Sequence, residues 1–245
     1  MRGRPSAIIE CVPGELWTVH LGVVEYRAAH DLQERLRAAR QAGAIPDTLL
    51  LLEHEPVYTR GRRSASGELG MGEDWYRAQG IDIVDVDRGG KVTYHGPGQL
   101  VGYPIVAIGD VMEYVAQIER AIAAALADEG IDAHGRSHEG IAWTGVWVQE
   151  RKLASIGLHV SQGVAKHGFA VNVDDSLEPF DWIVPCGLPH VRMTSVAAES
   201  ADAGPHLPCF RKRMAWRFAQ EHGARQRLVS RARVEAALAR TPVAV

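Results

Sequence analysis

The sequence predicts one α/β domain, and three observations lead to this expectation. The chain has 245 residues, which is at the upper end of what one domain of this class commonly holds. Short apolar or alternating runs, typical of strands, are interspersed with segments of helical periodicity. We find no internal repeat and no linker, so we expect a single domain over residues 1–245.

The first half of the chain is expected to alternate strands with helices. Residues 24–41 have the helical pattern, with Leu32 and Leu36 one turn apart and Gly43 as a stop signal. The segment 112–129 is the best helix, because its apolar residues repeat at helical spacing on one face and Gly130 follows. Strands are expected over residues 17–21, 48–52, 81–86 and 100–108.

The second half is expected to contain a three-stranded meander followed by a helix. The strands are predicted over residues 141–149, 153–160 and 168–173, and Glu150-Arg151 makes the first connection tight enough for a hairpin. Phe210, Met214 and Phe218 mark a helix over residues 210–221. The segment 224–245 is rich in Arg and Ala, and we interpret it as a C-terminal appendage without an assigned role.

The composition favours a cytoplasmic protein of ordinary globular type. Hydrophobic residues make up 46% and charged residues 23%, and the formal charge of −3 gives no overall attraction to nucleic acid or to an anionic membrane. No apolar run approaches the ~20 residues that span a bilayer, and the N-terminus lacks the apolar core of a signal peptide. Three cysteines cannot all pair, and their spacing matches no zinc motif.

The segment 88–99 is the most informative part of the sequence. It follows a predicted strand and contains four glycines, two cations, a His and a Gln within twelve residues. Glycine lets the backbone approach a ligand closely and adopt positive φ without steric cost. A plain surface turn is the alternative interpretation, although such a turn needs only one or two residues of this kind.

Cys186 is a candidate nucleophile. It lies between Pro185 and Gly187, so the backbone around the thiol is constrained and leaves room for a substrate. A buried structural cysteine is the commoner alternative. A reactive cysteine must be a thiolate, which requires a neighbouring cation or base that lowers the pKa of the thiol from about 8.5.

Lys152 is the candidate for that neighbouring group, because the predicted meander would hold its apolar stem. A solvated hairpin lysine is the alternative. His54, His95 and His167 are other possible bases, and each could equally be a structural histidine. The histidines show no His-Glu-x-x-His pattern and the chain has no P-loop, so we expect neither a metal site nor an ATP site of that type.

Taken together, these segments resemble the lipoyl(octanoyl) transferase family, whose members are octanoyl-[acyl-carrier-protein]:protein N-octanoyltransferases. The resemblance covers residues 21–221 and appears in family order. The matching segments are residues 52–59, 88–99, 145–148, 152–157, 167–173, 183–188 and 194–195.

The resemblance implies a biotin/lipoate protein ligase-like domain, in which a mixed β-sheet is flanked by helices. It also implies that Cys186 is the acyl-accepting nucleophile and that Lys152 activates it. The residues implied to bind the acyl substrate are Arg88, Gly89, Gly90, Lys91, Val92, Thr93, Tyr94, His95, Ser155, Ile156, Gly157, His167, Gly168 and Phe169.

The chemistry implied by the family is the transfer of an octanoyl group from acyl carrier protein, through a cysteine thioester, to a lysine of a lipoyl domain. Thioester exchange is nearly isoenergetic, so no cofactor and no metal are expected. The implied acceptors are the lipoyl domains of 2-oxoacid dehydrogenase complexes and the glycine cleavage H protein. We expect a monomer with no nucleic-acid or membrane partner.

Five basic residues would attract an acidic carrier protein despite the negative net charge of the chain. These are Arg60, Arg62, Arg63, Arg88 and Lys91. Each could equally be part of a solvated surface turn.

Three other functions compete with octanoyl transfer. An ATP-dependent lipoate or biotin protein ligase would use the same fold without needing Cys186. A non-catalytic binding protein would predict the loss of Cys186 or Lys152, yet both are present. A cysteine hydrolase would require a His/Asn partner pattern that the sequence does not show.

Overall fold

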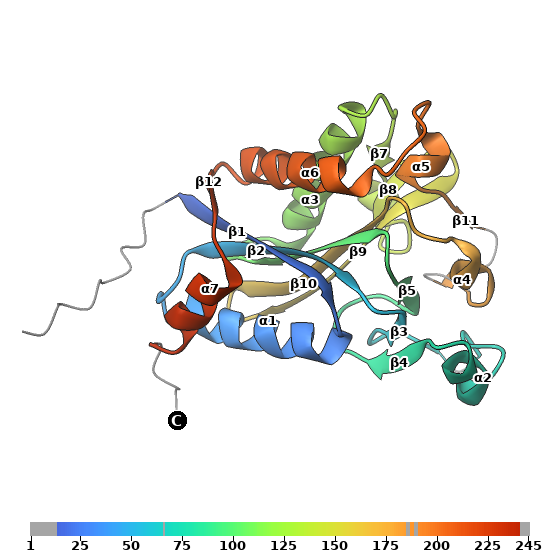
Figure 1. Ribbon diagram of the computed structural model, residues 1–245, viewed down its shortest axis with the longest axis horizontal. Coiled ribbons are helices and arrows are strands. Elements are labelled where there is room, and N and C mark those ends of the chain that lie inside the picture. The colour runs from blue at the N-terminus through green and yellow to red at the C-terminus, as the bar shows by residue number, and fades with distance from the viewer. Residues whose placement is uncertain (1–13, 66, 185–186, 189–190, 241–245) are drawn as a thin grey trace, which may run out of the picture.

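The computed structural model describes residues 14–65, 67–184, 187–188 and 191–240. The chain forms a nine-stranded mixed sheet and a separate three-stranded sheet, with helices on both faces of the larger one (Figure 1). This confirms the expected mixed sheet flanked by helices. Within the described residues, no helix is long and apolar enough to cross a membrane.

The large sheet combines parallel and antiparallel pairs. Its strand order is β12-β1-β2-β6-β10-β9-β8-β7, and β11 pairs with β9 outside this path. The strands are β1 (Glu15–Val24), β2 (Asp47–His54), β6 (Gln99–Ile105), β7 (His134–Gly135), β8 (Gly145–Val148), β9 (Arg151–Ser161), β10 (Val164–Asn172), β11 (Arg192–Met193) and β12 (Arg225–Leu228). The pairs from β2 through β7 are antiparallel, whereas β1 is parallel to both β2 and β12.

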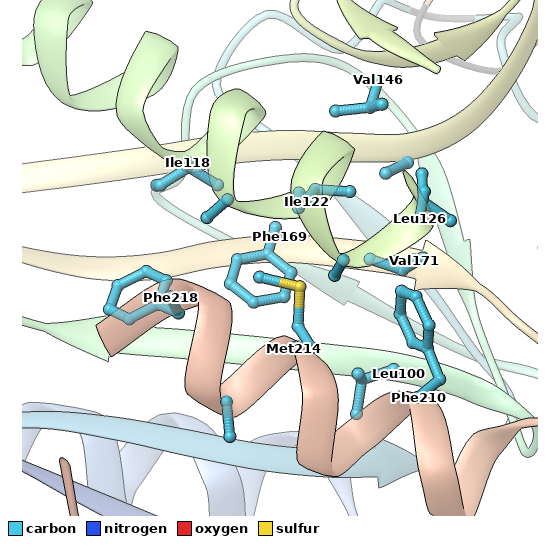
Figure 2. Packing of buried hydrophobic residues seen from close by; sticks show 14 of the residues in the cluster. Leu100, Ile118, Ile122, Leu126, Val146, Phe169, Val171, Phe210, Met214 and Phe218 are labelled. Atoms are coloured by element: carbon cyan, nitrogen blue, oxygen red, sulfur yellow. The ribbon is translucent and has the colours of Figure 1, made fainter. Parts of the chain in front are cut away.

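Two helices cover each face of the large sheet (Figure 1). On one face lie α3 (Val111–Ala127) and α6 (Leu207–Glu221), and on the other lie α1 (Tyr26–Gln41) and α7 (Arg231–Leu238). Figure 2 shows the first of these layers, where Ile118 and Ile122 of α3 meet Phe169 of β10 and Met214 of α6. This apolar layer holds α3 against the strands that carry the site.

Helices α1 and α3 begin at acidic capping residues. The Glu25 carboxylate accepts the backbone N–H groups of Arg27 and Ala28, both at 2.8 Å, and the Asp110 carboxylate accepts that of Glu113. A side-chain acceptor at this position satisfies donors that have no partner within the helix. Both helices lie where the apolar periodicity predicts them.

The small sheet packs beside the large one and carries the Gly-rich segment. It contains β3 (Val57–Arg60), β4 (Asp82–Asp85) and β5 (Thr93–His95) in the order β4-β3-β5. The short helices α2 (Glu73–Ala78) and α4 (Glu178–Asp181) pack near this sheet (Figure 1). The remaining short elements are α5 (Val196–Glu199) and the 3₁₀ helix η1 (Ser137–Glu139).

The predicted meander is confirmed, but its first strand begins later than predicted, and its third strand begins at Val164 rather than at residue 168. Strands β8, β9 and β10 are antiparallel neighbours, and two residues, Gln149 and Glu150, join β8 to β9. The first strand begins at Gly145 rather than at residue 141, because Trp143 donates its N–H to the carbonyl of Gly140 and closes a turn. This turn brings residues 141–144 to the candidate site described below.

The C-terminal segment is built into the fold, which differs from the expected appendage. Strand β12 pairs in parallel with β1 over Glu15–Thr18, and Val234 and Ala237 of α7 are buried with α1 in the second core layer. The Arg-rich sequence hides this because β12 is an edge strand whose charged side chains can reach Glu15.

Candidate active site

A cavity of about 220 Å³ opens between the Gly-rich segment, β9, β10 and the start of α3. Of the residues that sequence analysis assigns to the site, thirteen line it: Arg88, Gly89, Gly90, Lys91, Thr93, His95, Lys152, Ser155, Ile156, Gly157, His167, Gly168 and Phe169. Segments far apart in the chain therefore meet at one place. The cavity is lined mainly by apolar surface, as expected for an acyl pocket.

Two of the expected lining residues point elsewhere. Val92 and Tyr94 are buried in the core of the small sheet together with Tyr58 and Phe180, and they do not line the cavity. Successive side chains of a strand point to opposite faces. In β5, Thr93 and His95 therefore face the cavity, whereas their neighbours face the core.

The Gly-rich segment is held against β9 and β3 by specific hydrogen bonds. The N–H of Gly89 donates to the carbonyl of Leu158 at 2.9 Å, which continues the edge of β9. The buried Arg88 guanidinium donates to the carbonyl of Thr59 at 2.8 Å and to its hydroxyl at 2.7 Å. Arg88 thus fixes the loop and is not a mobile surface cation.

Asp87 joins this loop to β9, β10 and α1. Its carboxylate accepts from His167 Nε2 at 2.7 Å and pairs with Lys166 Nζ at 2.8 Å, while His159 Nδ1 donates to its carbonyl at 3.0 Å. Lys166 is 1% exposed and also pairs with Glu34 of α1. The hydrogen bond from His167, followed by that from Lys166, holds the pKa of Asp87 far below its usual range.

His167 has an unusual backbone and a neutral ring. Its φ is +56°, a left-handed backbone conformation that residues other than glycine rarely adopt. Burial lowers the pKa of His167 to about 4, although the hydrogen bond to Asp87 acts in the opposite direction. Because Nε2 carries the proton donated to Asp87, Nδ1 is a buried acceptor with no hydrogen-bond partner among the described residues.

Two glycines allow the cavity walls to approach each other closely. A Cβ on Gly157 would lie 2.9 Å from the carbonyl oxygen of Gly89, and one on Gly168 would lie 2.5 Å from Cδ of Pro104. Real Cβ atoms essentially never come within 3.0 Å of such neighbours. Any larger residue would therefore displace the loop or the neighbouring strand β6.

Lys152 is buried at the cavity wall and is not a solvated hairpin residue. It is 2% exposed, and its Nζ donates to the carbonyl of Thr144 at 2.9 Å. Its Nζ lies 5.3 Å from the centre of the Trp147 ring, within the range of a cation–π contact when the amine is protonated. Gly145 leaves room for this stem, because a Cβ there would lie 2.8 Å from Lys152 Cε.

Cys186 lies outside the described residues, so its predicted role stays a prediction. Its described neighbour Gly187 has φ +70° and lies against the side chain of Lys91, which lines the cavity. Lys91 pairs with the buried Glu68 at 2.9 Å, and the carbonyl of Glu68 accepts the N–H of Val184 at 3.3 Å. The described part of this segment therefore lies at the cavity.

Of the other two histidines considered as bases, His54 does not line the cavity. Its Nδ1 donates to the carbonyl of Val24, and its Nε2 accepts from the Tyr103 hydroxyl. Burial lowers the pKa of His54 to about 4, and burial also lowers that of His95 well below its usual value. His95 lines the cavity and donates from Nδ1 to Gln99 at 2.7 Å, so both rings are neutral at pH 7.

One group of side chains has the composition of a metal site, which sequence analysis did not anticipate. Ligand atoms of His30, Asp87 and His167 lie within 4.8 Å of one another. The Lys166 ammonium lies among them, 3.3 Å from His30 Nε2 and 2.8 Å from Asp87. A divalent cation would have to displace this buried ammonium, so the structure itself supplies the positive charge at this position.

Sequence analysis missed several residues that complete the cavity. They are Tyr26, Tyr103, Val111, Met112, Val115, Ile141, Ala142, Thr144, Leu158 and Ala170, whereas Arg63, which also lines the cavity, was expected to attract a carrier protein. Met112 and Val115 lie within the helix predicted over residues 112–129, but helical periodicity cannot show that the first turn of α3 reaches a cavity. Burial raises the pKa of Tyr26 to about 12, so its hydroxyl is a neutral polar group on the cavity wall.

Residues 25–218 match the lipoyl protein ligase A/B catalytic domain family. The chain belongs to this family. Two similar relatives are the octanoyltransferase of Solibacter usitatus, 49% identical over 73% of this chain and 80% of that protein, and the octanoyltransferase of Acidobacterium capsulatum, 42% identical over 75% and 80%. The octanoyltransferase of Dictyoglomus thermophilum is 40% identical over 82% of this chain and 84% of that protein.

Solved structures of lipoate ligases share the fold of this member of the family. A bi-partite lipoate protein ligase from Thermoplasma acidophilum has a TM-score of 0.71 at 17% identity, covering 92% of this chain and 91% of that one. Lipoate-protein ligase A bound with ATP has a TM-score of 0.70 at 16% identity, covering 94% and 93%. At this identity the likeness concerns the fold alone.

Proposed function

We propose that the protein is an octanoyltransferase, an acyltransferase that moves an octanoyl group from acyl carrier protein to a lysine of a lipoyl domain. The observation that carries this proposal is the buried Lys152 at the wall of an apolar cavity. The names of the relatives at 40–49% identity support the same activity.

The first half of the reaction forms an acyl-enzyme. The Cys186 sulfur attacks the thioester carbonyl, a new carbon–sulfur bond forms, and the thiolate of the phosphopantetheine arm leaves. One thioester replaces another, so the step needs no ATP. Lys152 is the group that we assign to take the proton from Cys186 and to return one to the leaving thiolate.

The second half transfers the acyl group to an amine. The acceptor lysine attacks the acyl-enzyme, the amide bond forms, and Cys186 leaves as a thiolate. The attacking amine must lose a proton, and Lys152 is the base that we assign to this step.

The cavity provides the binding energy for the acyl chain. Ile156 and Phe169 line it, and burial of each methylene contributes about 0.8 kcal/mol, so an octanoyl chain contributes several kcal/mol. His95 and His167 stay neutral at pH 7 because burial lowers their pKa values. At these two positions, neutral imidazole rings suit an uncharged acyl chain better than ionised rings would.

The proposal includes the compartment, the acceptors and the oligomeric state. A free nucleophilic thiol is kept reduced in the cytoplasm, where we place the reaction. The acceptors would be lipoyl domains of 2-oxoacid dehydrogenase complexes and the glycine cleavage H protein, and the enzyme would act as a monomer without cofactor or metal.

The ATP-dependent ligase is the second candidate, and the fold of an ATP-bound lipoate ligase is the observation in its favour. Its support is weaker, since that structure is 16% identical to this chain whereas the octanoyltransferases are 40–49% identical. A ligase would also not require a cysteine at position 186.

The test is a transfer assay from octanoyl-carrier protein to a lipoyl domain without ATP. We expect transfer by the wild type and a loss on the order of 10²–10⁴-fold for Lys152→Met, which keeps an apolar stem but removes the amine. Thermal unfolding of the variant checks that the fold is retained. Transfer that appears only with ATP and free octanoate would contradict the proposal and favour the ligase.

A further inference from the structure

One edge of the cavity carries exposed apolar side chains. Val111 and Met112, at the start of α3, are 42% and 48% exposed, and Ile141 in the turn after η1 is 60% exposed. All three line the cavity. We call these three residues the apolar rim. Exposed apolar patches at the opening of a pocket are typical of surfaces that bind a partner.

Two neighbouring arginines lie in the exposed turn after β3. Arg62 and Arg63 are exposed, and neither side chain makes an ion pair with any residue of the described chain. Their N–H groups donate to the carbonyls of Arg88 and Gly90, both at 3.0 Å, so their backbone is fixed to the Gly-rich segment. Arg63 itself lines the cavity.

The other three basic residues expected to attract a partner are engaged within the molecule. Arg60 pairs with Asp85 and Glu73, Lys91 pairs with Glu68, and Arg88 is buried against Thr59. Of the five basic residues expected to attract a carrier protein, three therefore have partners within the described chain, and Arg62 and Arg63 are the two that remain.

Acidic groups beside the apolar rim are also engaged. Asp110 caps α3, Glu113 pairs with Arg120 at 3.2 Å, and Glu139 pairs with Arg136 at 2.7 Å. Arg62 and Arg63 therefore carry positive charge that no ion pair with the described residues neutralises. A partner with acidic side chains around an apolar attachment point is complementary to this arrangement.

We propose that the apolar rim together with Arg62 and Arg63 is the docking surface for the acyl donor, an acidic carrier protein. This inference rests on the proposed function. The donor brings an uncharged acyl chain that can cross the apolar rim into the cavity. The acceptor brings a lysine ammonium, which the two arginines repel, so the charge at the opening favours the donor.

The experiment compares two donors of the same acyl group in single-turnover formation of the acyl-enzyme. One donor is octanoyl-carrier protein and the other is octanoyl-pantetheine, which lacks the protein. In Arg62→Glu, we expect kcat/KM for the carrier protein to fall about tenfold at low salt and less at high salt. Arg62 does not line the cavity, so the reaction with octanoyl-pantetheine should stay within about twofold of the wild type.

Three further variants test the apolar rim and the specificity of the effect. Met112→Ser should lower the rate with the carrier protein more than the rate with octanoyl-pantetheine, whereas Trp216→Ser removes a residue of similar exposure on α6 and should change neither. Arg231→Ala, which removes an exposed charge from α7 on the opposite face of the sheet, should also change neither.

Three results would overturn the inference. Equal losses with both donors would show that Arg62 affects the chemical step instead of docking. No loss with the carrier protein would show that Arg62 does not contribute to carrier-protein binding. A normal acylation step with slower transfer to the lipoyl domain would assign the surface to the acceptor. If the wild type forms no acyl-enzyme with either donor, the proposed function fails. The docking surface can then still be tested by fluorescence anisotropy, which compares the binding of the carrier protein to the wild type and to Arg62→Glu.

Discussion

The two sides of the cavity are held in different ways. On one side, which we call the loop wall, Arg88 and Gly89 are fixed by hydrogen bonds to Thr59 and Leu158, and Asp87 joins them to β10. On the other side, the apolar rim exposes Val111, Met112 and Ile141 to solvent. Side chains with many polar contacts give a defined shape, whereas exposed apolar side chains offer a surface that gains stability only when a partner covers it.

This difference indicates a division of tasks within one cavity. The loop wall would select and orient the acyl chain, and the apolar rim would receive the protein that carries it. Changes in the loop wall should therefore affect every acyl donor, whereas changes in the apolar rim should depend on which donor is used.

The largest effect is expected from a methyl group added to the loop wall. In Gly157→Ala, the new Cβ would lie 2.9 Å from the carbonyl oxygen of Gly89 and 3.2 Å from Arg88 Cδ, so the loop must move. A misplacement of about 1 Å can cost ~10²-fold in rate, and we expect a loss of that order in kcat/KM with either donor.

The matched control is Gly109→Ala, because no atom lies within 4 Å of a Cβ at that position. This variant should keep the activity of the wild type. An active Gly157→Ala would show that the loop wall adjusts freely and that the comparison between the two sides is wrong.

A smaller effect is expected when the anchor of the loop wall loses its charge. Asp87→Asn keeps the shape of the side chain but removes one of the two ionic partners of Lys166 and weakens the hydrogen bond from His167. We expect KM for octanoyl-pantetheine to rise about tenfold with little change in kcat, because Asp87 positions the loop and does not contact the reacting atoms. Steady-state kinetics measure both values.

Asp85→Asn is the control for this variant. Asp85 is two residues earlier, is 74% exposed and pairs with Arg60, so it carries the same charge without reaching the cavity. A fall in kcat with unchanged KM in Asp87→Asn would contradict a positioning role.

A third effect concerns stability instead of activity and is a pH dependence from His54, which packs behind the cavity. Burial lowers its pKa from 6.5 to about 4, so the unfolded chain binds a proton between these values and the folded chain does not. The stabilising contribution is complete above pH 6.5 and is lost as the pH falls toward 4. Between pH 7.5 and pH 5, the titration of His54 lowers the free energy of unfolding by about 2 kcal/mol.

Urea unfolding of the wild type and His54→Gln at these two pH values isolates the contribution. The variant should lose less stability than the wild type, by about the same 2 kcal/mol, because the other titrating groups are common to both proteins. Asp175, whose pKa is raised to about 7 by burial, acts in the opposite direction and is cancelled by this comparison. Equal losses in the two proteins would show that His54 is not a buried neutral histidine.

Local pattern was sufficient to predict most of the fold and part of the site. Leu32 and Leu36 mark α1, and the hairpin at Glu150 follows from alternation on either side of it. Lys152 was found because the meander that holds its stem is a local feature of the sequence. The contiguous assignment of residues 88–95 was too broad, since Val92 and Tyr94 alternate with the residues that face the cavity.

The features that escaped prediction depend on contacts between distant segments. Asp87 and Lys166 are about eighty residues apart, and no periodicity links them. Met112 and Ile141 meet at the opening because α3 packs on β9 and β10, which a local pattern cannot show. The roles of Arg60 and Lys91 were also hidden, because their acidic partners Asp85 and Glu68 lie on other segments.

The central claim is that the acyl group passes through a thioester on Cys186. It is tested most directly by intact-mass spectrometry after incubation with octanoyl-carrier protein without ATP, for the wild type and for Cys186→Ser. We predict one octanoyl adduct on the wild type that hydroxylamine removes, and no such labile adduct on Cys186→Ser. An unmodified wild-type protein that still transfers octanoate, or an equally labile adduct on Cys186→Ser, would contradict the claim.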